Sequence, residues 1–204
     1  NPIKKEIWKS IINNKLGKSN KFFARKFKII DLTGHKEFVY KYLEDNHLQG
    51  NCGYKYAYGL CNESNEVYSI MTFGKSRFDK NMEYELLRFC NLKNCTIVGG
   101  ASKLLKYFEK TINPTSIVSY ANRDWSQGNL YESLGFEFIK STSPNYFYTD
   151  TNRRIINRMS AQKHKLKNLL NENFNENLSE RDNMINNGYR IYYDTGNLVY
   201  HKKY

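Results

Sequence analysis

A stretch in the middle of the chain, residues 84–112, constrains the fold more than any other. Tyr84–Asn91 (YELLRFCN) carries apolar side chains on both faces, which is typical of a central strand covered from two sides. Thr96–Ala101 follows as a turn with two adjacent glycines, and Ser102–Ile112 reads as an amphipathic helix that Pro114 stops. A strand, a glycine turn and a helix in this order predict an α/β fold with a mixed central sheet flanked by helices.

Hydrophobic periodicity extends this prediction in both directions along the chain. Helices are expected over 4–16, 33–46, 127–134 and 179–187, a basic helical segment over 153–174, and strands over 22–31, 54–61, 67–73 and 116–120. Three hairpins are expected: one joining 54–61 to 67–73, one joining 136–141 to 145–149, and a terminal one joining 189–193 to 198–200. We therefore expect three parts: a basic N-terminal helical extension over 1–24, the α/β domain over 25–150, and a basic C-terminal extension with helix and hairpin over 151–204.

The charge of the chain favours polyanionic partners. Its 204 residues include 32 Lys and Arg against 20 Asp and Glu, a formal net charge of +12. The basic residues concentrate in Lys4–Lys28 and again in Arg153–Lys167, so two flanking segments could contact a phosphate backbone. The same excess also arises in any soluble protein from a Lys- and Asn-rich proteome, and this alternative stays open.

The cysteine spacing and the apolar runs of the chain indicate the cellular compartment in which the protein is expected. The four cysteines lack CxxC spacing, so we expect reduced thiols in a cytoplasmic protein, with a composite zinc site that includes His35 or His47 as the alternative. No apolar run is long enough to span a membrane, and no secretory signal is visible, so no membrane partner is expected. Because the first residue is Asn1 and not Met, we expect a processed product or part of a longer protein.

The glycine turn is a candidate phosphate site. A glycine turn that opens a helix exposes backbone N–H groups at the positive end of the helix dipole, and such groups bind phosphate. The turn has neither the GxxxxGK[ST] spacing of a P-loop nor the GxGxxG spacing of a dinucleotide site. On its own, Gly99-Gly100 is equally well explained as a tight turn before a helix.

Downstream motifs connect this turn to a family. The chain resembles the GCN5-related N-acetyltransferases, the GNAT superfamily, over residues 25–150. Their pyrophosphate loop reads Q/R-x-x-G-x-G/A, which Thr96-x-x-Gly99-x-Ala101 matches at its second and third fixed positions. Their later motif is a strand that ends near an Asn, followed by a helix with Y-x-x-x-G-F, which Asn122 and Tyr131–Phe136 match.

The resemblance implies an acyl-CoA cofactor, with acetyl-CoA the first candidate, and a site for it. Gly99, Gly100 and Ala101 would offer N–H groups to the pyrophosphate of the cofactor. The implied cofactor-binding set further includes Thr96, Val98, Ser102, Lys103 and Asn122. Tyr131 would be the general acid for the departing thiolate, with an aromatic side chain packed in the core as the alternative. No metal is implied.

A general base for the acceptor amine has three candidates. Glu85 lies on the strand before the glycine turn, and Glu83 two residues earlier on the same face would raise its proton affinity. His47 ends an early helix in a region that lines the acceptor site of this superfamily, although it could equally be an exposed helix-end His. Asp124 follows Asn122 at the carboxyl end of a strand, where α/β sheets place ligands.

A narrower resemblance points to nucleic acid, with DNA preferred. The stretches 84–91, 98–108 and 119–136 look like phage proteins with this domain, including the Mom DNA-modification proteins and nuclease-associated domains. The expected nucleic-acid contacts are Arg123, Trp125, Arg153, Arg154, Arg158 and Lys163. Three functions stay open: an acyltransferase that modifies DNA, one that acts on a protein, small amine or aminoacyl-tRNA, and a non-catalytic DNA-binding module of a larger nuclease.

Overall fold

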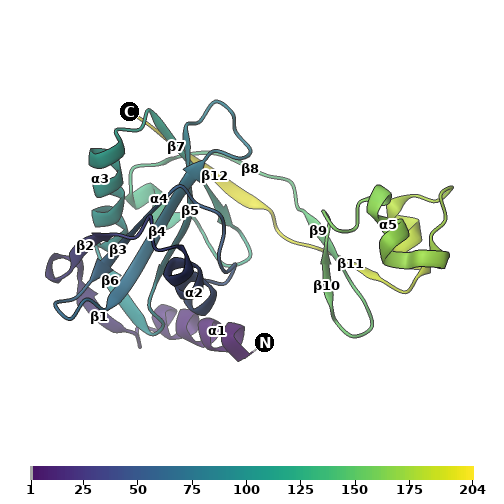
Figure 1. Cartoon of the computed structure of the whole chain (residues 1–204), viewed down its shortest axis with the longest axis horizontal. Helices are drawn as coiled ribbons and strands as arrows, with labels where there is room; N and C mark the ends of the chain where they lie inside the picture. The colour runs from purple at the N-terminus through teal and green to yellow at the C-terminus, as the bar shows by residue number, and fades with distance from the viewer. Residues whose placement is uncertain (1) are drawn as a thin grey trace. The chain divides into compact units, whose positions relative to one another are not determined.

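The computed structural model describes residues 2–204 (Figure 1). The α-helices are α1 (Pro2–Lys15), α2 (Lys36–Asn46), α3 (Gly100–Ile112), α4 (Asn129–Ser133), α5 (Lys163–Leu170) and α6 (Glu180–Asn186). The strands are β1 (Asn20–Phe23), β2 (Lys28–Asp31), β3 (Tyr56–Cys61), β4 (Val67–Lys75), β5 (Tyr84–Asn91), β6 (Cys95–Val98), β7 (Ser116–Asn122), β8 (Glu137–Ser141), β9 (Tyr146–Thr149), β10 (Ile155–Asn157), β11 (Arg190–Tyr193) and β12 (Asn197–Lys203). None of the helices within residues 2–204 is both long and apolar enough to cross a membrane.

A seven-stranded mixed sheet is the centre of the fold. Its strand order is β2-β3-β4-β5-β7-β12-β8, in which β2 to β5 are antiparallel neighbours and β5 pairs with β7 in parallel. A separate parallel pair, β1 with β6, lies just before the start of α3. The prediction of an α/β fold with a mixed central sheet is confirmed.

Helices α2 and α3 cover opposite faces of this sheet. Phe108 of α3 stacks on Phe73 of β4 with ring centroids 3.7 Å apart. Val39 and Leu43 of α2 are fully buried in a cluster that includes Ile70 of β4. Because side chains alternate along a strand, Ile70 and Phe73 point to opposite faces, so β4 is covered on both sides. This explains why β4 and β5 carry apolar residues without strict alternation.

The predicted hairpin of β3 and β4 is confirmed, whereas the other two predicted hairpins are wrong. Strand β9 pairs with β10 and β11 in a sheet of its own, and does not pair with β8. Strand β12 lies between β7 and β8 in the large sheet, and does not pair with β11. The predicted partner of β9 was the preceding strand, but β9 pairs with the following strand β10 and with the distant β11. The predicted partner of β12 was also the preceding strand, but β12 pairs with the distant β7 and β8.

The described residues form two compact units. The first unit contains residues 2–120, 128–139 and 199–204, and the second contains residues 121–127 and 140–198. The N-terminal helix α1 belongs to the first unit, and the chain returns to that unit at its last six residues. The domain boundaries expected from sequence, at 24 and 150, therefore fall inside these units.

The second unit has its own small core. Its sheet, in the order β10-β9-β11, packs Tyr148 and Ile156 against Leu166 and Leu170 of α5 and Met184 of α6. Helix α6 begins as predicted, because the Ser179 hydroxyl accepts a hydrogen bond from the Asp182 backbone N–H at 3.1 Å. The basic segment predicted as one helix over 153–174 instead contains strand β10 before α5.

Candidate functional site

The amino end of α3 opens with Gly99 and Gly100. Gly99 has a φ of +78°, a left-handed conformation that favours glycine. Gly100 is buried, and a Cβ at this position would lie 3.1 Å from the Ile97 side chain. No side chain caps the helix, so the N–H groups of its first turn, including those of Ala101 and Ser102, are turned outward at its positive end. Such a helix start is suited to bind an anion.

Two side chains that were predicted to reach the cofactor are engaged within the fold. The Thr96 hydroxyl lies 2.6 Å from that of Ser19 in a hydrogen bond. The Lys103 ammonium donates to two backbone carbonyls of the 24–27 turn, at 2.9 and 2.5 Å. Both residues therefore fasten the glycine turn to the N-terminal segment. Val98, which is 45% exposed, remains accessible beside the turn.

A bulge distorts β5 before it reaches this turn. The register between β4 and β5 shifts between Thr72 and Phe73, which leaves Leu87 as an extra residue on β5. Gly74 of β4 makes room for it, because a Cβ there would lie 2.9 Å from a Leu87 methyl carbon. A bulge re-aims the residues that follow it, here Arg88 onward.

On its other side, β5 stays paired with β7 only briefly. The parallel register comprises Tyr84 with Ile117 and Glu85 with Val118. At the next residues the contact is a side-chain hydrogen bond, from the Ser119 hydroxyl to a carbonyl of β5 at 3.0 Å. The carboxyl-terminal halves of two parallel neighbours are thus left without mutual backbone pairing, which is the edge at which α/β sheets bind ligands.

Tyr131 of α4 approaches this same edge. Its ring stacks on Tyr200, with centroids 5.2 Å apart and planes at 22°, and meets Phe136 edge-on. Burial raises the pKa of the Tyr131 phenol, while a hydrogen bond with Ser119 and the positive charge of Arg88 act in the opposite direction. The phenol is therefore protonated at neutral pH and can donate a proton.

Glu85 is not the free base that the sequence suggested. Its side chain is 3% exposed, and both carboxylate oxygens accept from the Arg77 guanidinium, at 2.5 and 3.1 Å. Glu83 faces away into a different contact, in which it accepts from the backbone N–H and hydroxyl of Thr115 at 2.7 and 2.9 Å. The expected pair of neighbouring carboxylates therefore does not form, and Glu85 is an ion-pair partner of Arg77.

His47 is a weak base in this structure. Burial, followed by the positive charges of Arg88 and Lys4, lowers the pKa of its imidazole to about 3. Its Nδ1 accepts from the Gln49 backbone N–H at 3.2 Å, so the proton of the neutral ring resides on Nε2. An imidazole with a lowered pKa, whose Nδ1 already accepts a hydrogen bond, has little capacity to take a substrate proton, and the base role expected of His47 stays a prediction.

Arg88 is a site residue that the sequence analysis did not single out. Its guanidinium donates to two backbone carbonyls, of Gly50 at 3.2 Å and of Leu87 at 2.8 Å. Among residues 2–204, no carboxylate lies within ion-pair distance of it. Its charge acts on Tyr131 and His47, as their pKa shifts indicate. A charged residue within the otherwise apolar β5 was the signal available in the sequence.

The predicted site residues from Asn122, at the end of β7, to Trp125 lie in the second unit. The Asp124 carboxylate accepts from the Thr195 backbone N–H at 3.2 Å and from its hydroxyl at 2.8 Å. Asn122 accepts from the Asp124 N–H at 2.7 Å, and the exposed Arg123 donates to the Thr195 carbonyl at 3.0 Å. Trp125 is half-buried. Asp124 and Arg123 thus hold the turn before β12, and their predicted roles toward ligands stay predictions.

The basic residues predicted to bind nucleic acid are spread over the second unit. Arg153 and Arg154 lie in the turn between β9 and β10, where Arg153 has a φ of +61°. The Arg158 guanidinium lies over the Tyr146 ring, 5.2 Å from its centroid. Lys163 is exposed at the start of α5.

The part of the chain that the structure describes contains no candidate metal site. No group of three or more His, Cys, Asp or Glu side chains among residues 2–204 could hold an ion. Cys52, Cys61, Cys90 and Cys95 are free thiols. The composite zinc site considered from sequence is therefore not formed by these residues.

No protein-family model matches the chain, and no curated protein sequence matches it either. Solved structures do match. A protein assigned as an acetyltransferase from Acinetobacter baylyi is 11% identical, with a TM-score of 0.50 over 87% of this chain and 93% of that one. A mutant spermidine N-acetyltransferase from Vibrio cholerae is 10% identical, with a TM-score of 0.50 over 88% and 94% of the two chains.

Other matches have lower TM-scores. A Bacillus subtilis acetyltransferase in complex with CoA is 15% identical, with a TM-score of 0.44 over 88% of this chain and 99% of that one. The chain spans 64% of the length of an acetyltransferase from Corynebacterium glutamicum. At these identities the likeness concerns the fold. The chain has the fold of the GNAT acetyltransferases, as its glycine turn and Tyr131 motif predicted.

Proposed function

We propose that this chain transfers an acyl group from acyl-CoA to an amine of a nucleic acid. The observation that carries the proposal is the uncapped amino end of α3 in a GNAT fold, with the Tyr131 phenol directed to the edge where β5 and β7 cease to pair. The first feature suits the phosphates of the donor, and the second suits its thioester.

The start of α3 fits the pyrophosphate of a CoA thioester. A pyrophosphate needs several N–H donors and no side chain between them and its oxygens. At Gly99 the nearest heavy atom to an added Cβ would be the Ala24 methyl at 3.7 Å, so the approach to the turn is open. The fit relies on backbone groups, because the Lys103 ammonium is bound to carbonyls of the fold.

Tyr131 supplies the proton for the leaving group. In the transfer, the acceptor nitrogen bonds to the thioester carbonyl carbon, the C–S bond breaks, and the departing thiolate takes the Tyr131 proton. The nitrogen loses its own proton to solvent, and Tyr131 is reprotonated from solvent. A phenol whose pKa is raised by burial stays protonated until the thiolate forms, as a general acid must.

Charge around the site favours an uncharged amine as acceptor. Arg88 has no carboxylate partner among the described residues, and the Glu85 carboxylate is neutralised by Arg77. A polyamine or lysine ammonium would be repelled by Arg88 and would need a base to remove its proton before attack. The exocyclic amine of a nucleobase is neutral at pH 7. Arg88 therefore does not repel it, and no base has to remove a proton before it attacks. The net charge of +12 adds a general attraction for a polyanion.

Titration calorimetry with acetyl-CoA tests the donor site. Ser102→Asp places a negative charge in the first turn of α3, where it stabilises the helix but repels a pyrophosphate. We expect acetyl-CoA binding by the natural chain, at least tenfold weaker binding by Ser102→Asp, and unchanged binding by the matched control Ser64→Asp in the exposed turn between β3 and β4. Equal affinity in all three would overturn the donor site.

Transfer of labelled acetyl groups tests the acceptor. Single-stranded DNA, duplex DNA, tRNA and spermidine are each incubated with the protein and acetyl-CoA labelled in the acetyl group. Label on a nucleic acid that is lost in Tyr131→Phe supports the proposal. Label on spermidine alone would show that the acceptor is a small amine, and acetyl-CoA binding without any transfer would favour a non-catalytic binding module.

A further inference from the structure

The three-stranded sheet of the second unit has one open face. The register aligns Ile155, Thr149 and Arg190 in one row across β10, β9 and β11, and Asn157, Phe147 and Tyr192 in the next row. Because side chains alternate along each strand, these six residues point to the same side. The intervening row, which includes Tyr148 and Ile156, points to the other side and is buried against α5 and α6.

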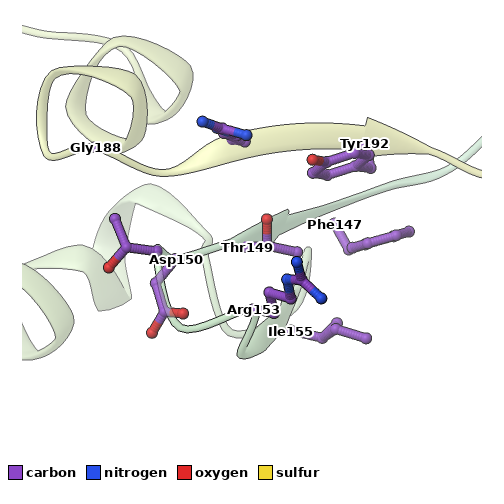
Figure 2. A pocket seen from close by; sticks show the side chains of 9 residues that line it. Phe147, Thr149, Asp150, Arg153, Ile155, Gly188 and Tyr192 are labelled. Atoms are coloured by element: carbon purple, nitrogen blue, oxygen red, sulfur yellow. The ribbon is translucent and has the colours of Figure 1, made fainter.

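Large apolar side chains remain uncovered on this open face. Tyr192 is 45% exposed and Ile155 is 67% exposed. The rings of Phe147 and Tyr192 stack, with centroids 5.7 Å apart and planes at 14°. Figure 2 shows these two rings on neighbouring strands at one end of a pocket of about 710 Å³. Exposed aromatic pairs of this kind are uncommon on a surface that contacts only water.

Two arginines line the same pocket. Arg153 enters from the turn after β9, and Arg190 from β11. Neither has a carboxylate within ion-pair distance among residues 2–204. The acidic residue of the lining, Asp150, accepts a hydrogen bond from the Arg154 backbone N–H at 2.8 Å, so its carboxylate is directed into the turn. The pocket thus combines flat apolar faces with two uncompensated positive charges.

We infer that this face binds single-stranded nucleic acid. A base stacks against the Phe147–Tyr192 pair, and the flanking phosphates contact Arg153 and Arg190. Stacking on exposed aromatic residues together with phosphate contacts is how proteins hold unpaired strands. A duplex fits less well, because its base faces are already stacked on one another. A second copy of this chain would bring its own Arg153 and Arg190 against the same charges.

This inference rests on the nucleic-acid part of the proposed function, and it adds residues that neither the sequence nor the fold assigned. Of the four basic residues predicted for the C-terminal segment, only Arg153 lines the pocket. Arg158 instead lies over Tyr146, whose ring packs with the covered face. Phe147, Arg190 and Tyr192 lie outside both basic clusters of the sequence.

Fluorescence anisotropy with labelled oligonucleotides tests the face in the full chain. The probes are single-stranded DNA and RNA of about 15 nucleotides and the matching DNA duplex, each at several salt concentrations. We expect both single strands to bind more tightly than the duplex. Tyr192→Leu should weaken binding about tenfold, since it removes a stacking platform. Arg190→Gln should weaken binding and reduce the slope of log K against log salt by about one.

Two matched control variants distinguish binding at this face from a general effect of substitution on nucleic-acid binding. Tyr193→Leu changes the next residue of β11, which points to the opposite side, and Arg181→Gln removes an exposed charge on α6. Both should bind like the natural chain. Equal losses in the controls, or tighter binding of the duplex, would overturn the inference.

The remaining outcomes are distinguished by two further measurements. Sedimentation that shows a dimer lost in Tyr192→Leu would mean that a second copy covers the face, which overturns the inference. Acetyl-CoA titration into Tyr192→Leu should match the natural chain. Strand binding without acetyl-CoA binding would therefore contradict the donor site alone, and acetyl-CoA binding without strand binding would contradict this face alone.

Discussion

The ring of Tyr131 on α4 stacks on the ring of Tyr200 on the last strand, with centroids 5.2 Å apart. Tyr200 is 1% exposed, and its hydroxyl donates to Glu132 at 3.2 Å. The final residues of the chain therefore fix the orientation of the candidate general acid. Positioning by a buried, ordered neighbour is what a proton donor needs if its hydroxyl is to meet a leaving group at a fixed place.

Removal of the Tyr131 hydroxyl should impair transfer and spare donor binding. In Tyr131→Phe the ring stays and the stack on Tyr200 is kept, so the fold should be unaffected. We expect the turnover of acetyl transfer to fall between about a hundredfold and ten thousandfold, the usual contribution of a general acid. The acetyl-CoA dissociation constant should change less than threefold. A parallel loss of donor affinity and melting temperature would instead assign Tyr131 a packing role.

Gly128 should tolerate no side chain. Its φ is +86°, and a Cβ there would lie 1.8 Å from the Tyr200 hydroxyl oxygen. We expect Gly128→Ala to lower the free energy of unfolding by about 2 kcal/mol or more, from left-handed strain and overpacking together. Gly17→Ala is the matched control, since Gly17 has a φ of +72° and open space around it. Urea unfolding should show about 1 kcal/mol for the control.

The contribution of the clash is separable by a double mutant. Tyr200→Phe removes the atom nearest to the added methyl group, so it should restore part of the stability lost in Gly128→Ala. The two changes are then non-additive by an amount that measures the contact. Strict additivity would show that the strand carrying Tyr200 moves away freely.

Local patterns in the sequence were sufficient to predict those strands and helices whose signal lies within the element itself. The boundaries of β5 and the Ser179 cap of α6 agree with expectation, because the pattern that predicts each lies within it. Pairing across the chain was not predictable in this way. Strand β12 takes its place between β7 and β8 because of contacts with residues about 60 or more positions away, such as that of Tyr200 with Glu132.

The candidate site likewise has features that were predictable from local sequence and features that were not. The turn at Gly99 was predictable, since its positive φ is a conformation that glycine favours. The Lys103 ammonium was not, because it is bound by carbonyls 76 and 79 residues earlier in the chain. Arg77 was missed because its partner Glu85 lies across a loop, and only the folded chain brings their charges together.

Loss of Arg77 should leave Glu85 as an uncompensated buried charge. In Arg77→Gln the carboxylate keeps one backbone donor and loses its cation. We expect a loss of about 2 kcal/mol at pH 7, below the range for fully buried pairs because the Arg77 side chain is 47% exposed. Urea unfolding at pH 7 measures the loss, and a loss below about 0.5 kcal/mol, as for an ordinary surface substitution, contradicts this account.

The companion variant Glu85→Gln should be milder. It removes the buried charge and leaves Arg77 half exposed, where water can solvate the guanidinium. Chemical denaturation of both single variants and the double variant gives the coupling between the two residues. A loss in Glu85→Gln as large as that in Arg77→Gln would mean that hydrogen bonding, and not charge, determines the stability of this pair.

His47 should make the fold sensitive to mild acid. Its pKa is about 3 in the folded chain against an ordinary value of 6.5, so the unfolded chain takes up a proton that the folded chain refuses. Stability is therefore full above pH 6.5 and falls as the pH drops toward 3, by about 2 kcal/mol between pH 6.5 and 4.5. In His47→Gln that part of the pH dependence should disappear, whereas His164→Gln, at an exposed position of α5, should retain it. Unfolding curves of the three proteins in urea at pH 7.5, 6, 5 and 4.5 measure the effect, and parallel behaviour of all three would show that the His47 imidazole is free to protonate in the folded chain.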